Sequence, residues 1–184
     1  ALNVAQIAEK SGIPTIKSFF GTETVEKIIN SGKKADILIA FNVLPHVPNL
    51  NDFVLGMKNI LSKNGIIIVQ FSAYLLDVIK KSEFDMIYHE HFSYFSLFTI
   101  KKIFESVNLE IFNVEESSVH GGSLRVYISK DLNKKKDLSI NRILNEEKKF
   151  GIQKFKTYQI FAKKIENIKI NVQKNIIFLK NKFN

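Results

Sequence analysis

Two short, almost uninterrupted apolar runs constrain the fold of this chain more than any other feature. Residues 35–41 read ADILIAF, and residues 66–71 read IIIVQF. Runs of this length, rich in β-branched residues and bounded by polar or glycine-containing turns, are typical of strands buried on both faces of a parallel sheet. A segment with apolar residues at helical spacing separates the two runs. The sequence therefore predicts an α/β fold built from strand–helix–strand units.

The rest of the first 130 residues alternates between helical and strand-like patterns in the same way. Apolar residues three and four positions apart predict a helix, and short runs of β-branched or alternating residues predict a strand. We expect helices over 2–8, 22–30, 51–61, 74–81 and 97–107, with Thr22 capping the second and Asn51 or Asp52 capping the third. We expect further strands over 14–20, 109–114 and 124–128, the last two as an antiparallel hairpin at a sheet edge.

Residues 130–184 differ from the rest in charge and pattern. They hold 15 Lys and Arg against five Asp and Glu, in a chain whose net charge is +9. A basic surface can contact nucleic acid or an acidic membrane, but we favour a solvated lysine face and expect neither partner. Apolar residues at steps of three and four predict a long amphipathic helix: Phe161, Ile165, Ile168, Val172, Ile176, Leu179 and Phe183. Its apolar stripe must pack on the sheet or on another chain, so a homo-oligomer is possible.

Composition narrows the setting in which the chain works. The absence of cysteine excludes disulfides and thiolate metal sites, and fits a reducing, cytoplasmic environment. No apolar run approaches the ~20 residues that span a bilayer. The first residues also lack the basic start and long apolar stretch of a signal peptide. We therefore expect a cytoplasmic protein with an ordered core.

The most unusual local composition lies in residues 85–96, which read DMIYHEHFSYFS. Two of the four histidines, His89 and His91, flank Glu90 there, with Tyr88 and Tyr94 beside them. Imidazole titrates near neutrality, so it exchanges protons at working pH, and a neighbouring carboxylate can orient it. Structural histidines are the alternative, but the density of the cluster favours a functional interpretation. Because no third ligand has suitable spacing, we expect no metal site.

The position of this segment suggests where a ligand binds. In open α/β sheets, ligands bind where the carboxyl ends of the parallel strands meet. Because loop 42–46 follows the first apolar run and the histidine segment follows the helix after the second, we expect His46 and His91 to share one cleft. Asn42 at the strand end either binds a ligand or only turns the chain. Phe20 either stacks on a planar base or packs in the core.

Three strings resemble those of one enzyme family. They are FNVLPHVPNL at 41–50, FDMIYHEHFSYFS at 84–96 and HGGSLRVY at 120–127, and they look like the sugar C-methyltransferases. These enzymes use S-adenosyl-L-methionine to methylate a carbon of nucleotide-linked 4-keto deoxysugars. The resemblance implies a Rossmann-like class I methyltransferase sheet with a helical C-terminal extension, S-adenosyl-L-methionine as cofactor and a nucleotide-sugar substrate.

The resemblance also implies a role for each matching side chain. His91 would be the base that removes the proton beside the ketone, with Glu90 and Tyr88 orienting it and holding the sugar. Such a proton is acidic enough for an imidazole when the enolate oxygen is stabilised, and the carbanion can then attack a sulfonium methyl group. The binding roles fall on four residues, with His46 and Tyr94 assigned to the substrate, and Phe20 and Asn42 to the cofactor.

The chain also departs from the family pattern. Full-length relatives begin with a cysteine-bound zinc domain, then carry a glycine-rich first strand that grips the cofactor, and they end in a second α/β domain. At 70–73 the family tends to show EFPH, where this chain has QFSA. We therefore expect 1–130 to form a methyltransferase-like domain without its first strands, and 131–184 a basic helical segment leading into a missing C-terminal domain. An inactive truncated fragment that serves as a binding or assembly module is the alternative.

Overall fold

The computed structural model of the protein describes residues 2–183. Within them, four strands form one sheet in the order β1-β2-β4-β3, which confirms the α/β prediction. The strands are β1 (Ala35–Phe41), β2 (Leu61–Ser72), β3 (Glu110–Ser117) and β4 (Ser123–Ser129). The α-helices are α1 (Leu2–Lys10), α2 (Thr22–Asn30), α3 (Leu50–Ile60), α4 (Leu75–Lys81), α5 (Leu97–Glu105), α6 (Leu138–Phe150) and α7 (Phe155–Phe183). The short 3-10 helices are η1 (Leu44–His46), η2 (Phe84–Met86) and η3 (Val119–Gly121).

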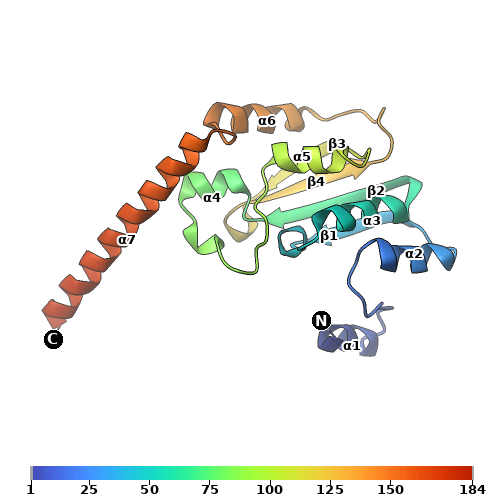
Figure 1. Cartoon of the computed structure of the whole chain (residues 1–184), viewed down its shortest axis with the longest axis horizontal. Helices are drawn as coiled ribbons and strands as arrows, with labels where there is room; N and C mark the ends of the chain where they lie inside the picture. The colour runs from blue at the N-terminus through green and yellow to red at the C-terminus, as the bar shows by residue number, and fades with distance from the viewer. Residues whose placement is uncertain (1, 184) are drawn as a thin grey trace.

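The sheet combines a parallel pair with an antiparallel hairpin. β1 and β2 are parallel neighbours, with Phe41 opposite Gln70 near their carboxyl ends. β4 pairs antiparallel with both β2 and β3, so the predicted hairpin is confirmed, with β3 at the sheet edge. The carboxyl ends of β1 and β2 therefore lie side by side, next to η1 and the start of α4 (Figure 1). Loops that leave this end of the sheet can build a site together.

One face of the sheet holds the hydrophobic core beneath α3, α5 and α6 (Figure 1). Ile67, Val69 and Phe71 of β2 point into this core and are fully buried. Phe104 of α5 and Ile143 of α6 belong to the same cluster. Removal of this apolar surface from water is the main term that stabilises the fold.

The opposite face corrects the expectation that residues 35–41 are buried on both sides. Ile37 and Ile39 of β1 are 61% and 59% exposed, and Phe41 is exposed as well. A parallel strand is buried on both faces only where helices cover both. Within residues 2–183, β1 lies at the sheet edge and its outer side chains remain uncovered.

Three local predictions are wrong. Residues 14–20 form an irregular connector between α1 and α2 rather than a strand, because they have no strand partner within the described chain to take up their backbone hydrogen bonds. Thr22 does not cap α2: the cap is Gly21, and the Thr22 hydroxyl donates to the Asp52 carboxylate. Asn49, rather than a later residue, caps α3, because its side-chain oxygen accepts the Asp52 N–H at 3.3 Å.

The two C-terminal helices differ in how they pack. The amphipathic pattern is confirmed as α7, which has no buried residue and extends away from the sheet (Figure 1). α6 was not predicted as a separate element, yet it packs on α5 and β3, and it buries Ile140 and Ile143. The division of the chain near residue 130 stays a prediction. None of the helices within 2–183 has both the length and the apolar character required to cross a bilayer.

Candidate active site

The carboxyl ends of β1 and β2 bring two histidines together. His46 ends η1, directly after β1, and His91 lies in the loop between α4 and α5. The backbone N–H groups of Phe92 and Ser93 donate to the Pro45 carbonyl at 2.8 and 3.3 Å, which ties this loop to η1. As a result, the ring centroids of His46 and His91 lie 4.9 Å apart. The sequence-based expectation that they share one location is confirmed.

His91 is held through both ring nitrogens and is only 7% exposed. Its Nδ1 lies 3.0 Å from the Met86 carbonyl oxygen, and its Nε2 lies 3.1 Å from the Tyr88 hydroxyl. Because a carbonyl oxygen only accepts, Nδ1 must carry the proton. We therefore assign Nε2 as the unprotonated nitrogen, which accepts the Tyr88 O–H.

The surroundings of His91 favour this neutral form. Burial lowers the pKa of His91, and the nearby His46 lowers it further. The hydrogen bond to the Met86 carbonyl and the Glu90 charge act in the opposite direction, but the pKa stays below its ordinary value. At neutral pH the imidazole therefore presents a lone pair, which is what a general base requires.

His46 and the two tyrosines complete the cluster around this ring. The Nδ1 of His46 donates to the Glu90 carbonyl at 2.9 Å, so His46 can donate a second hydrogen bond, from Nε2, only when it is protonated. The ring of Tyr88 lies 4.3 Å from that of His91. The Tyr94 ring meets His91 edge to face at 5.5 Å, and its hydroxyl oxygen accepts the Tyr88 N–H at 3.2 Å. Tyr88 and Tyr94, two of the aromatic residues in the predicted cluster, thus contact one imidazole.

Glu90 and His89 lie on the outside of this cluster. Both residues are exposed, and within 2–183 no hydrogen bond joins the Glu90 carboxylate to His91. Glu90 instead contributes its backbone carbonyl to His46, so an orienting role for its carboxylate stays a prediction. His89 meets the Tyr88 ring at 6.5 Å. The described residues contain no group of three potential metal ligands.

Asn42 lies at the carboxyl end of β1 in an unusual conformation. Its φ of 53° places it in the left-handed region, which costs a non-glycine residue energy. Its N–H donates to the Gln70 carbonyl at 2.8 Å. Its side-chain oxygen is buried and has no hydrogen-bond partner among residues 2–183. A buried acceptor without a donor costs about 1–3 kcal/mol, so this oxygen is suited to accept a hydrogen bond from a ligand.

Ala73 repeats this conformation at the end of the neighbouring strand. Its φ is 55°, directly after β2. Left-handed non-glycine residues cluster at ligand sites, where the surrounding structure supports the strain. Asn42 and Ala73 share this conformation at adjacent strand ends, on the edge of the sheet where the histidines lie, and Ser82 and Asn108 adopt it at the ends of helices. We call Asn42, His46, Tyr88, His91 and Tyr94 the histidine site.

Phe20 lies in a different environment. Its ring packs edge to face on Phe53 of α3, with centroids 5.0 Å apart, and it is partly buried against the core. This contact fits the core alternative that the sequence left open. A stacking role toward a cofactor stays a prediction for Phe20.

A polar row that the sequence did not reveal supports the strand ends. Gln70 is 7% exposed, and its side-chain oxygen accepts two N–H groups of Arg125 at 2.9 and 2.7 Å. The Arg125 guanidinium also lies over the Phe41 ring at 5.2 Å. These contacts fix the side chain of Gln70, and the Gln70 backbone carbonyl accepts the Asn42 N–H. The partners come from three strands, so no local pattern could have predicted the row.

Comparison with protein families gives two matches along the chain. Residues 3–114, more than half of the sequence, match the family described as a methyltransferase domain. Residues 118–183 match the family described as the C-methyltransferase C-terminal domain. The chain is also similar to the C-methyltransferase NovU of Streptomyces niveus, with 31% identity over 174 residues. This similarity covers 94% of the chain but only 41% of NovU, so the chain spans less than half of that relative.

Solved structures of methyltransferases are more distant. A SAM-dependent methyltransferase from Anabaena variabilis is 13% identical, with a TM-score of 0.45 over 60% of this chain and 55% of that chain. Magnesium protoporphyrin IX methyltransferase (ChlM) from Synechocystis, with bound SAH, is 19% identical, with a TM-score of 0.40 over 53% of this chain and 45% of that chain. At such low scores these likenesses carry no weight for the function.

Proposed function

Because this chain belongs to the methyltransferase family, with a C-terminal part that matches the C-methyltransferases, we propose that the complete protein methylates a carbon atom of its substrate. S-adenosyl-L-methionine is the methyl donor in this proposal. The observation that carries it is the placement of His91 against His46 and Tyr88 at the carboxyl ends of β1 and β2. Methyl transfer to a saturated carbon beside a ketone needs a base that first removes a proton, and a neutral, buried imidazole suits that step.

The substrate that we propose is a nucleotide-linked keto-deoxysugar. Support for it comes from the resemblance of strings 41–50, 84–96 and 120–127 to the sugar C-methyltransferases, and from the chemistry of the histidine site. A carbon beside a ketone loses a proton to imidazole when a hydrogen bond stabilises the enolate oxygen. The Tyr88 hydroxyl donates to His91. When substrate binds, the same hydroxyl can donate to a substrate oxygen instead of to His91.

In this reaction His91 acts as the base, and Tyr88 stabilises the enolate that forms. Nε2 of His91 takes the proton from the carbon beside the ketone, and the C–H electrons form the enolate. The Tyr88 hydroxyl, and His46 when it is protonated, donate to the enolate oxygen. Bound S-adenosyl-L-methionine would supply an electrophilic methyl group: the bond from sulfur to this group would break as the enolate carbon takes it, and the electron pair of the broken bond would stay on sulfur as a neutral thioether.

Asn42 is the residue best suited to hold the cofactor. Its buried side-chain oxygen is an acceptor, and it lies at the strand end where ligands of α/β sheets bind. Within the described residues this oxygen has no donor, so a hydrogen bond from the cofactor would satisfy it. Phe20 and Tyr94 keep the cofactor and substrate roles that the resemblance assigns to them.

A non-catalytic binding or assembly module is the second candidate. The exposed outer face of β1 and the helix α7, which has no buried residue, favour it. In this alternative, α7 pairs with a second copy of the chain, and the molecular mass seen by light scattering rises with concentration. A cytoplasmic setting also remains a proposal, which fractionation of cells would test.

The decisive test uses the complete protein with S-adenosyl-L-methionine that carries a deuterated methyl group. Incubation with nucleotide-linked keto-deoxysugars should give a product with the labelled methyl group on carbon, as seen by mass spectrometry and NMR. His91→Gln should abolish the product, whereas the neighbouring His89→Gln, an exposed position, should retain it. A Kd for the cofactor near or below about 1 μM, or −8 kcal/mol, would accompany activity. Transfer to oxygen, or none in the complete protein, would contradict the proposal.

A further inference from the structure

We propose that Glu147 is a positioning residue for His91, because its buried carboxylate joins the two ends of the segment that contains α4 and residues 82–96. We call residues 82–96 the histidine loop. A catalytic consequence of this role rests on the function proposed above. The structural role does not, so the two can be tested separately.

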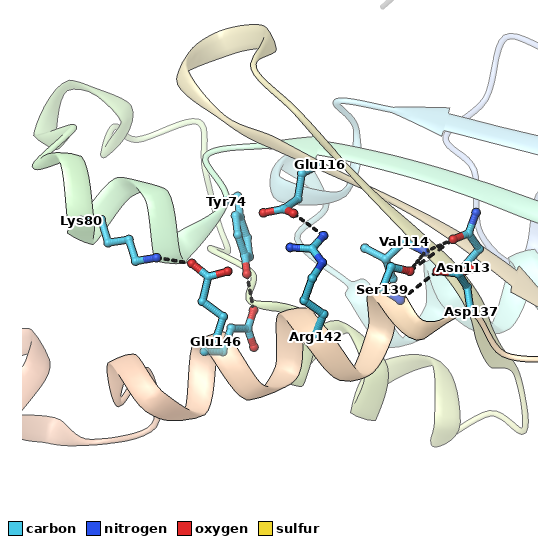
Figure 2. Close-up of polar contacts among 10 residues, drawn as sticks. Tyr74, Lys80, Asn113, Val114, Glu116, Asp137, Ser139, Arg142 and Glu146 are labelled. Carbon is cyan, nitrogen blue, oxygen red and sulfur yellow. Dashed lines mark hydrogen bonds and ion pairs between the residues drawn. The ribbon is translucent and has the colours of Figure 1, made fainter.

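Glu147 makes three hydrogen bonds to residues far away in the sequence. Its Oε1 accepts the Tyr74 O–H at 2.8 Å and the Leu97 N–H at 2.6 Å, and its Oε2 accepts the Phe98 N–H at 3.0 Å. Figure 2 shows Tyr74 pointing toward α6, with a dashed line marking its hydrogen bond. Glu147 itself is 1% exposed. We call Tyr74, Leu97, Phe98 and Glu147 the Glu147 anchor.

The first contact of the anchor is the start of α5, directly after the histidine loop. A helix leaves its first backbone N–H groups without intrahelical partners. In α5, Leu97 and Phe98 donate to Glu147, Thr99 donates to the Ser96 side chain at 3.2 Å, and Ile100 donates to the Ser96 carbonyl. All four donors are therefore satisfied, and a negative charge at a helix N-terminus is also favourable.

The second contact of the anchor lies before the histidine loop. Tyr74 caps α4, the helix from which the loop departs. The Leu75 N–H donates to the Phe95 carbonyl at 3.0 Å, so the beginning and end of the segment also meet directly. A neighbouring ion pair joins Lys80 of α4 to Glu146 of α6 (Figure 2). The start of α4 and the start of α5, which flank the histidine loop and α4, are thus both held by Glu147 of α6.

The loop between these anchored ends has little regular structure of its own. Residues 87–96 contain neither a helix nor a strand. The hydrogen-bond partners of His91 are near it in the sequence, at Met86 and Tyr88, and the loop meets η1 through the Phe92 and Ser93 N–H groups. The placement of the ring therefore depends on these contacts together with the anchored start of α5. Because Ser96 is only five positions from His91, a shift at the start of α5 moves the imidazole as well.

A buried carboxylate is an unusual choice for a purely structural contact. Burial raises the pKa of Glu147, while its three hydrogen bonds oppose that change. Burial and the adjacent Glu147 charge likewise raise the pKa of Tyr74 above its ordinary range. Charged groups are rarely buried without partners, because desolvation is costly. The carboxylate is retained here with each donor in place, which is consistent with a requirement for defined geometry.

The test compares two adjacent glutamates by NMR of the imidazole nitrogens of His91, in the chain of 184 residues. Glu147→Gln keeps the size of the side chain but replaces one acceptor oxygen by an amide donor, so it loses an α5 contact. Glu146→Gln, the matched control, removes only the exposed ion pair with Lys80. We expect Glu147→Gln to loosen the hydrogen bond from Nδ1–H of His91 to the Met86 carbonyl and, because that bond raises the pKa of His91, to lower this pKa further. Glu146→Gln should leave the His91 signals unchanged.

A folded Glu147→Gln variant with His91 signals like those of the parent protein would overturn the proposal. If that variant does not fold, Tyr74→Phe decides, because it removes one hydroxyl and leaves both α5 contacts. Displaced His91 signals in Tyr74→Phe would support positioning, and unchanged signals would refute it.

The catalytic consequence has its own readout in the complete enzyme. Misplacement of a base by a fraction of an ångström costs on the order of tenfold to a hundredfold in rate. We therefore expect Glu147→Gln to lower kcat by that factor, with KM changed by less than about twofold. A changed His91 spectrum in a protein without methyl transfer would reject the proposed function and leave the positioning role intact.

Discussion

The histidine site lies in the loop between α4 and α5, and the Glu147 anchor holds the segment that carries this loop, but the two differ in how fully their polar groups are paired. In the anchor, every carboxylate oxygen and every helix N–H has a partner. In the site, the Asn42 side-chain oxygen has none among residues 2–183, and Tyr88 is 41% exposed. Paired groups stabilise a fold, whereas groups without partners are ready for a ligand. Substitutions near the Glu147 anchor should therefore affect mainly stability, and substitutions in the histidine site should affect mainly ligand binding and catalysis.

The largest effect on stability should come from the helix that carries the anchor. Ile143 of α6 is fully buried, so Ile143→Ala should lower the free energy of unfolding by about 2–5 kcal/mol. Ile168 of α7 is 42% exposed, and Ile168→Ala should change it by less than about 0.5 kcal/mol. Urea denaturation measures both. Equal losses would show that α7 packs as tightly as α6.

Substitution in the histidine site should lower kcat and leave the melting temperature nearly unchanged. Tyr88→Phe removes the hydroxyl that donates a hydrogen bond to His91. Loss of one hydrogen bond to the transition state should lower kcat about tenfold. The melting temperature should change little, because the residue is exposed. Tyr127→Phe, which loses a surface contact with Glu115, is the control. A large fall in the melting temperature of Tyr88→Phe with no fall in kcat would contradict the assignment of Tyr88 to the histidine site.

Asn42→Gly separates strain from binding at one position. Glycine adopts the positive φ without cost, so the free energy of unfolding should change by less than about 1 kcal/mol in either direction. Loss of the acceptor oxygen should weaken cofactor binding by up to about tenfold. Calorimetric titration of the complete protein measures the second effect. Unchanged affinity would make Asn42 a turn residue only.

A smaller effect should appear in the pH dependence of stability. The pKa of His91 in the folded state is lowered by burial below the ordinary 6.5. The unfolded chain therefore binds more protons in this range, so the contribution of His91 is complete above pH 6.5 and is lost as pH falls through the folded-state pKa. The difference in unfolding free energy between the parent protein and His91→Gln, followed from about pH 8 to pH 5, should shrink on acidification. A constant difference would contradict the assigned burial.

The sequence predicted those features that depend on local pattern. Two apolar runs indicated β1 and β2, and the rule for strand carboxyl ends placed His46 beside His91. The Tyr74–Glu147 contact joins residues 73 positions apart. Residues 146–149 read EEKK, which is typical of an exposed helix surface, so no local pattern signals that Glu147 is buried. Residues 14–20 have strand-like composition, but a strand also needs a neighbour, which composition does not reveal. The outer face of β1 is exposed because no helix covers it within residues 2–183, and the composition of the strand does not reveal whether a helix will cover it.

The most direct test of the central claim is proton exchange at the substrate carbon beside the ketone. The complete protein, with S-adenosyl-L-homocysteine in place of the methyl donor, is incubated in D₂O with the keto-deoxysugar, and deuterium incorporation is followed by NMR. The account predicts that the parent protein and His89→Gln catalyse exchange, and that His91→Gln slows it by on the order of a hundredfold or more. Exchange at the parental rate in His91→Gln would contradict the assignment of His91 as the base.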